Sequence, residues 1–150
     1  MNNFREYLAQ KGIKLKVVHF SEGTRTAQDA SRALGCEVGQ IAKTIAFRAG
    51  DRPILVALCG SSRVNLDKLS AQVGSSVRIM TANEVKKELG YTIGGVPAFG
   101  YPNQPITFID SKLFRFTTVY SAAGTPNAVY PISPQKLCKF ACAHKAEITQ

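Results

Sequence analysis

The chain has 150 residues, a length that suits a single domain with a hydrophobic core of its own. Hydrophobic residues make up 45% of the sequence and charged residues 19%, a balance typical of globular rather than disordered proteins. No apolar run approaches the roughly 20 residues of a membrane span, and the polar N-terminus lacks a signal-peptide core, so we expect a cytoplasmic protein without a membrane partner.

The charge is strongly basic, with 19 Lys and Arg against 10 Asp and Glu and a net charge of +9. Such an excess attracts polyanions such as nucleic acids without encoding any sequence preference, although simple solubility explains it equally well. No RNA-stacking motif or Arg-rich tail accompanies the charge. The sequence therefore does not predict a dedicated RNA-reading module.

The first half of the chain predicts alternating helices and strands. In order, these are a helix ending near Gly12, a strand at 14–20, a helix at 26–35, strands at 41–47 and 54–59, a helix at 65–74 and a strand at 77–80. The second and third helices each begin at a capping side chain, Thr26 or Asn65, and end at a glycine. The segment 48–53 between the two middle strands indicates a hairpin.

The second half continues the mixture. It predicts a helix at 81–90 with a capping box, strands at 106–110, 116–120 and 128–132, and a helix beginning at Ser133. The strand 54–59 is apolar on both faces, which suits a central strand covered on each side. We predict an α/β or α+β fold with one mixed sheet, helices packed around it, and a single domain over 1–150.

Lys43 is the most unusual charge in the chain. Because strand side chains alternate between faces, Lys43 shares its face with Ile41, Ile45 and Phe47. A buried ammonium without a partner costs several kcal/mol. Lys43 therefore either extends to the sheet edge or points into a pocket that holds a negative or polar group.

Two loops are rich in Gly and Pro. In the segment 91–102, Gly94 and Gly95 permit unusual backbone angles and leave room for a ligand, while Pro97 restrains Val96. This loop is either a tight turn or a rigid wall that recognises a ligand through its main-chain groups. The segment 121–127 has similar composition, so the two loops are candidates for opposite rims of one cleft.

Asp110 ends a predicted strand and is the only acidic residue between Glu88 and Glu147. It is either a pocket residue that binds an amine or a cap for the turn before Lys112.

Several kinds of site lack sequence support. The spacing Cys138-x3-Cys142-x-His144 has no second pair of ligands, so we predict neither a metal nor another cofactor. The sequence contains no phosphate-binding P-loop, dinucleotide fingerprint or HExxH motif, and neither His19 nor His144 has a recognisable Ser or Cys partner. An enzyme of this sequence would work by positioning and backbone polarity around one lysine.

Six segments, in this order and spacing, resemble the YbaK/ProX family, free-standing relatives of the editing domain inserted in bacterial prolyl-tRNA synthetase. The segments are TAQDASRALG, IAKTIAF, ILVALCGSSRVNLDKL, GYTIGGVPAFG, ITFID and SAAGTPNAVYPISPQKL. The resemblance covers roughly residues 15 to 140 and implies a barrel-like mixed sheet surrounded by helices.

The resemblance also implies an activity, trans-editing aminoacyl-tRNA deacylation, and partners. The substrate would be a mischarged tRNA, typically proline tRNA, with a synthetase as a possible second partner and no role for DNA. Lys43 matches the key lysine of the family and would be the catalytic residue. The predicted substrate-binding residues are Phe20, Thr26, Thr44, Gly94, Gly95, Val96, Pro97, Ala98, Asp110, Ser121, Gly124 and Asn127.

The chain departs from the family pattern at two of these positions. Ala98 stands where the family loop has proline, and Phe20 stands where one branch has tyrosine. The amino acid that is removed stays open among cysteine, alanine, serine and threonine. A non-catalytic tRNA- or synthetase-binding module of the same fold and a small-molecule hydrolase are the alternatives.

Overall fold

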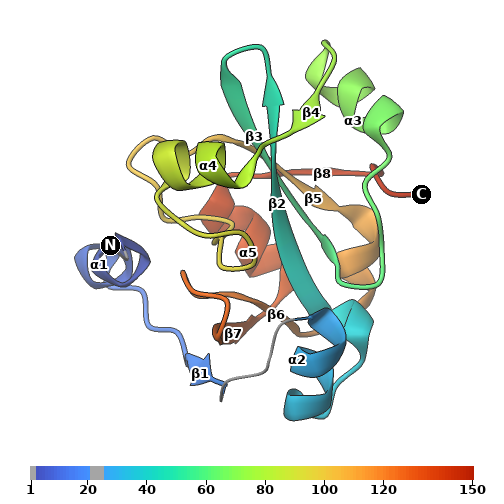
Figure 1. Ribbon diagram of the computed structural model, residues 1–150. Coiled ribbons are helices and arrows are strands. Elements are labelled where there is room, and N and C mark those ends of the chain that lie inside the picture. The colour runs from blue at the N-terminus through green and yellow to red at the C-terminus, as the bar shows by residue number, and fades with distance from the viewer. Residues whose placement is uncertain (1–2, 21–25) are drawn as a thin grey trace.

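The computed structural model describes residues 3–20 and 26–150, and places one mixed sheet at its centre (Figure 1). The strands are β1 (Val18–His19), β2 (Ile41–Ala49), β3 (Arg52–Cys59), β4 (Arg78–Ile79), β5 (Ile106–Asp110), β6 (Val119–Ala122), β7 (Ala128–Ile132) and β8 (His144–Ala146). Their order across the sheet is β1-β7-β6-β2-β3-β5-β8, and β4 pairs with β2 beside this row. The predicted mixed sheet is confirmed.

The helices surround this sheet, as predicted (Figure 1). They are α1 (Asn3–Lys11), α2 (Ala27–Leu34), α3 (Leu66–Val73), α4 (Ala82–Glu84), which continues as the π-helical turn η2 (Val85–Leu89), and α5 (Pro134–Ala141). Short 3-10 helices occur at η1 (Val38–Gln40) and η3 (Ser111–Arg115). No helix of the described residues is both long and apolar enough to cross a membrane.

Local capping determines where the helices begin. The Thr26 hydroxyl accepts a hydrogen bond from the Asp29 amide, and Asn65 and Ser133 cap α3 and α5 in the same way. Gly35 ends α2 with a φ of 69°, a left-handed angle that glycine adopts without steric cost. The predicted caps are therefore confirmed.

Two predicted strands have wrong boundaries, and one strand was missed. Only Val18 and His19 of the segment 14–20 form a strand. β6 begins at Val119 rather than 116 because residues 116–117 form a bend after η3. The strand β8 was not predicted, since its three residues lack apolar alternation and are held by parallel pairing with β5. Cys142 ends α5 with a φ of 50°, a left-handed angle.

The long hairpin of β2 and β3 divides the core into two clusters. Ala42 and Ala46 face the larger cluster, where Phe4 of α1 contacts the ring of Phe99 at a centroid distance of 5.3 Å. Phe47 faces the smaller cluster with Ile54, its partner on β3. The alternation predicted for β2 is correct, but the larger core covers the alanine face because small side chains allow the aromatic layer to approach closely.

Candidate functional site

One edge of β2 is only partly covered by other strands. On the side away from β3, β6 pairs with Ile41 and Ala42, whereas β4 pairs with Phe47 and Arg48. Between these two partners the strand edge is open over Lys43, Thr44 and Ile45 among the described residues.

The hydrogen bonds at the two ends of this gap show which peptide groups face it. The Gly60 amide donates to the Ile41 carbonyl at 2.6 Å on the β3 side, and the Met80 amide donates to the Ala46 carbonyl at 3.0 Å on the other side. Since main-chain groups alternate in direction along an antiparallel strand, Thr44 directs its N–H and C=O away from β3. Both groups of Thr44 therefore face the gap.

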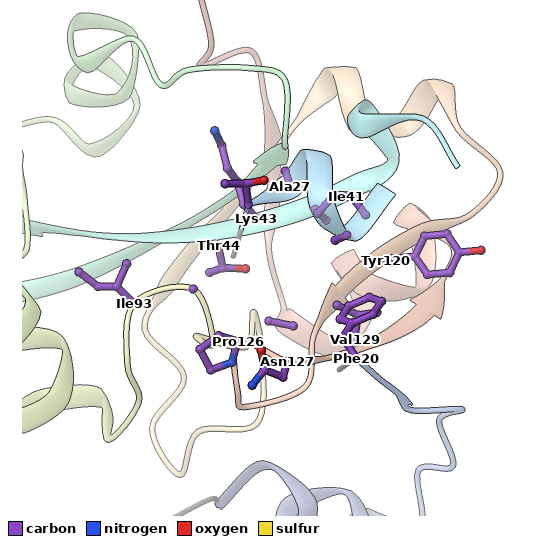
Figure 2. Close-up of a pocket in the computed structure, with 15 residues that line it drawn as sticks. Phe20, Ala27, Ile41, Lys43, Thr44, Ile93, Tyr120, Pro126, Asn127 and Val129 are labelled. Atoms are coloured by element: carbon purple, nitrogen blue, oxygen red, sulfur yellow. The ribbon is translucent and has the colours of Figure 1, made fainter. Parts of the chain in front are cut away.

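A cavity of about 540 Å³ lies at this open edge (Figure 2). Its walls come from α2, β2, β6, β7 and the two Gly- and Pro-rich loops. The lining residues are Phe20, Thr26, Ala27, Ala30, Ile41, Ala42, Lys43, Thr44, Ile93, Gly94, Tyr120, Ala122, Pro126, Asn127 and Val129. The lining is mainly apolar, with a few polar groups, as is typical of small-ligand sites.

Lys43 is half-buried at the rim of this cavity. Its ammonium donates to the Gly60 carbonyl at 3.5 Å, and no acidic residue of the described chain lies within ion-pair distance. Burial lowers the pKa of the Lys43 ammonium, and the neighbouring Arg63 guanidinium lowers it further, against a smaller opposing effect of Cys59. Lys43 thus reaches the end of β3 at Gly60 and also borders the cavity, beside a second cation.

Thr44 occupies the opposite face of β2 from Lys43. Figure 2 shows the lysine side chain on one side of the strand and the threonine side chain on the other, toward the two loops that carry Ile93 and Pro126. Thr44 is only 9% exposed, and its hydroxyl has no hydrogen-bond partner in the described structure. A buried hydroxyl without a partner is uncommon and costs about 1–3 kcal/mol, so it requires an explanation.

The two Gly- and Pro-rich loops pack directly against each other. A Cβ atom on Gly95 would lie 2.7 Å from the Thr125 carbonyl carbon, and one on Gly94 would lie 3.7 Å from Pro126 Cβ. The loops therefore form one shared rim instead of opposite rims. At Gly95 the missing side chain allows contact between the loops and does not open space for a ligand, which corrects the sequence interpretation.

Six of the predicted site residues border the cavity: Phe20, Thr26, Lys43, Thr44, Gly94 and Asn127. The others do not border it: Gly95, Val96, Pro97, Ala98, Ser121, Gly124 and Asp110. Ala98 and Ser121 are fully buried, and the Pro97 carbonyl accepts a hydrogen bond from the Tyr101 hydroxyl at 2.7 Å. All seven are buried and take no part in the cavity wall.

Asp110 is the clearest departure from the predicted set. Its carboxylate accepts hydrogen bonds from the amides of Lys112 and Ile148 and from the Thr149 hydroxyl, and it is fully buried. These contacts cap the turn before Lys112 and fix the C-terminal segment to β5. Of the two interpretations of Asp110, the structure favours the cap.

Sequence reasoning missed most of the apolar wall. Ala27 and Ala30 of α2 and Tyr120 of β6 border the cavity, as do Ile93 and Pro126. The helical spacing of the two alanines was visible in the sequence and indicated an inward face. The Tyr120 contribution depends on the parallel pairing of β6 with β2, for which the sequence holds no local signal.

Metal ligands do not gather in the described residues, where no group of three or more His, Cys, Asp or Glu side chains lies close enough to hold an ion. The four cysteines are free thiols, and the Cys138 thiol donates to the Ala143 carbonyl at 3.3 Å.

The fold and the sequence together define a class of protein. The model of the aminoacyl-tRNA editing domain family matches residues 21–140, and the chain belongs to this family. A solved structure described as a candidate trans-editing enzyme for prolyl tRNA synthetase superposes with a TM-score of 0.93 at 34% identity, covering 99% of this chain and 95% of that one.

Two curated proteins are also similar. The uncharacterized protein YwhH of Bacillus subtilis is 30% identical over 141 residues, which is 93% of this chain and 90% of that protein. The proline–tRNA ligase of Thermosipho melanesiensis is 27% identical over 92 residues. The match spans 61% of this chain but only 16% of that ligase, so the chain resembles a small part of it.

Proposed function

We propose that this protein is a trans-editing deacylase that hydrolyses the ester between a wrong amino acid and the 3′ end of a tRNA, with proline tRNA as the substrate. The observation that carries the proposal is the cavity at the open edge of β2, with Lys43 at its rim, in a chain of the editing-domain family. A cavity of about 540 Å³ has room for a terminal nucleoside with a small acyl group.

Lys43 supplies positive charge where the nucleic acid would enter. Two neighbouring cations, Lys43 and Arg63, repel each other in the free protein, and an anion placed near both relieves that repulsion. A terminal phosphate of tRNA is such an anion. We assign Lys43 the role of holding the phosphate or ribose end and stabilising negative charge that grows on the ester carbonyl oxygen.

The reaction needs a water molecule at the ester carbonyl carbon. Water attacks this carbon, the tetrahedral intermediate collapses, and the ester C–O bond breaks to release the amino acid and a tRNA hydroxyl. None of the described lining residues is His, Asp, Glu or Cys, so we assign activation of the water to the neighbouring ribose hydroxyl. Holding the ester and the water in position can supply several kcal/mol, on the order of 7 or more in favourable cases.

The proposal is tested by incubating the protein with proline tRNAs charged with cysteine, alanine, serine or threonine and measuring release of the free amino acid. We expect release from at least one of the four, and none from correctly charged prolyl-tRNA. Binding that weakens with salt but releases no amino acid would instead indicate a non-catalytic tRNA-binding module. Hydrolysis of small esters at a rate indifferent to tRNA would indicate a small-molecule hydrolase.

A further inference from the structure

The open stretch of β2 leaves one complete peptide unit available to a ligand. Ala42 is paired with β6, and the Ala46 carbonyl accepts a hydrogen bond from Met80. Between them, only Thr44 directs an N–H and a C=O into the gap, and neither group has a hydrogen-bond partner among the described residues. Unpaired main-chain groups at a strand edge are a template for binding another extended segment.

We propose that Thr44 binds the aminoacyl residue of the ester as a strand residue would, by exchanging two main-chain hydrogen bonds with it. This inference rests on the proposed function and identifies the part of the substrate that the β2 edge recognises. The Thr44 carbonyl accepts from the α-ammonium group, and the Thr44 amide donates to the ester carbonyl oxygen. Thr44 is thus a substrate-binding residue through its backbone.

The direction of the substrate follows from the chemistry of the gap. In an antiparallel hydrogen-bonded pair, two opposed residues exchange both bonds, whereas a parallel residue needs two partners on the other strand. Thr44 alone is available, so the aminoacyl residue lies antiparallel to β2 and continues the line of β4. Its ammonium then points toward Ala46, and its ester points toward Lys43 and the larger cavity, where the adenosine fits.

The side chain of the bound amino acid has a place in this arrangement. Opposed residues of such a pair direct their side chains to the same face, here the face of the Thr44 hydroxyl. A second, apolar cavity of about 140 Å³ lies on that side, lined by Thr44, Ile45, Ala46, Ile79, Met80, Val85, Ile93 and Val96. Ile79 and Ile93 are each 59% exposed, and an occupant of this cavity would cover them.

The orphaned Thr44 hydroxyl fits the same interpretation. It borders both cavities, is buried, and has no partner in the described structure. Beside a bound aminoacyl residue it can hydrogen-bond to the ammonium group or to a polar side chain. The three polar groups of Thr44 thus all face the bound aminoacyl residue.

The test uses 15N-labelled full-length protein and stable analogues in which an amide replaces the ester. The analogues are 3′-aminoacylamino-3′-deoxyadenosines carrying alanine, serine, threonine or cysteine, together with a lactoyl control that lacks the ammonium group. At saturation with a binding analogue, we expect hydrogen exchange of the Thr44 amide to slow by at least about 10-fold. The amides of Lys43 and Ile45, which face β3, should change little.

The lactoyl control tests the Thr44 carbonyl separately. Loss of a hydrogen bond from a charged group predicts binding about 10- to 100-fold weaker than that of the alanyl analogue. Equal affinity of the two, unchanged Thr44 exchange at saturation, or failure of every analogue to bind would each overturn the inference.

The outcome also separates this inference from the proposed function. If the protein deacylates a mischarged tRNA while hydrogen exchange of the Thr44 amide is unchanged by the analogues, the inference is wrong and the proposed function stands. If the Thr44 amide responds but no mischarged tRNA is deacylated, the inference stands and the proposed activity is wrong.

Discussion

The two halves of the β2 edge differ in how they are completed. Near Arg48 the edge is closed by β4, and the Arg48 guanidinium binds both carboxylate oxygens of Glu88 at 2.8 and 2.9 Å. Near Thr44 the same strand, paired with the same β3, has no second strand beside it within the described chain, and a cavity takes that place.

This difference shows how a sheet can build a binding site without special residues. Closing an edge uses hydrogen bonds and ion pairs within the chain, and therefore contributes to stability. Leaving an edge open keeps the same hydrogen-bonding groups for a ligand. We expect variants at the open stretch to affect substrate turnover and variants at the closed stretch to affect unfolding.

The largest effect is expected for Lys43→Met. Removing a cation that stabilises developing charge should lower kcat/KM on the order of 100-fold or more. The melting temperature should stay unchanged or rise, because burial and Arg63 disfavour the Lys43 charge in the folded state. Deacylation kinetics on a mischarged proline tRNA and thermal melts measure the two quantities.

Lys139→Met is the matched control for the Lys43 variant. Lys139 lies on an exposed position of α5 away from the cavity, and the substitution removes the same charge. Its kcat/KM should stay close to that of the unmodified protein. If both variants lose activity equally, net charge and not the position of Lys43 is responsible.

The next effect concerns the shared rim of the two loops. In Gly95→Ala, the new Cβ would meet the Thr125 carbonyl carbon at 2.7 Å and its Cα at 2.8 Å, so the loops must separate. Overpacking of this kind costs about 1–3 kcal/mol, and we expect kcat/KM to fall about 10-fold as the rim shifts. Thermal melts and deacylation assays check both expectations.

Gly74→Ala separates backbone strain from this clash. Gly74 ends α3 with a φ of 86°, and a Cβ there would meet no atom within 4 Å. We expect about 1 kcal/mol of destabilisation from the left-handed angle and no loss of kcat/KM. An unchanged kcat/KM in Gly95→Ala would show that the contact between the loops does not matter for the site.

The sequence predicted those structural features that depend on residues close together along the chain. Capping residues such as Thr26 and Asn65 and the closing glycines act within one helical turn, so the helix limits could be predicted. Lys43 stood out because a charge interrupts an apolar strand. Thr44 was predicted to bind substrate only by resemblance, since its open peptide unit exists because β6 and β4 end where they do.

The long-range contacts of Asp110 and Gly95 could not be predicted either, because they also join distant parts of the chain. Asp110 has a short-range and a long-range contact, with Lys112 and with Ile148, and the sequence suggested only the first. The contact between Gly95 and Thr125 joins loops 30 residues apart. Pairing of distant segments decides such cases, and one sequence carries little information on it.

A smaller effect is expected from Glu88→Gln at the closed end. The substitution removes the charge that binds Arg48 with little change in shape. Partly exposed ion pairs contribute about 1 kcal/mol or less, so urea unfolding should show a loss of that size. Turnover should not change measurably. Glu147→Gln, which loses a longer and more exposed pair with Lys68 at 3.5 Å, should be less destabilising still.

The smallest effect concerns the turn that carries the chain from β4 into α4. The Arg78 guanidinium, followed by the Thr81 amide, lowers the pKa of the Glu84 carboxyl to about 2. Because this pKa lies below the usual value of about 4.3, the stabilisation is complete above about pH 4.3 and is lost as the pH falls toward 2. Glu84→Gln should therefore flatten the decline of melting temperature over that range.

The expected signature of Glu84→Gln is a convergence of two melting curves. At neutral pH the variant should melt below the unmodified protein. The difference should shrink as the pH falls through 2, where Glu84 is about half protonated in the folded state, and vanish below that pH. Glu6→Gln, which removes an exposed carboxylate from α1, controls for the loss of one charge. A difference that stays constant from pH 7 to pH 2 would show that Glu84 stabilises the turn into α4 through its shape and hydrogen bonds alone, without its charge.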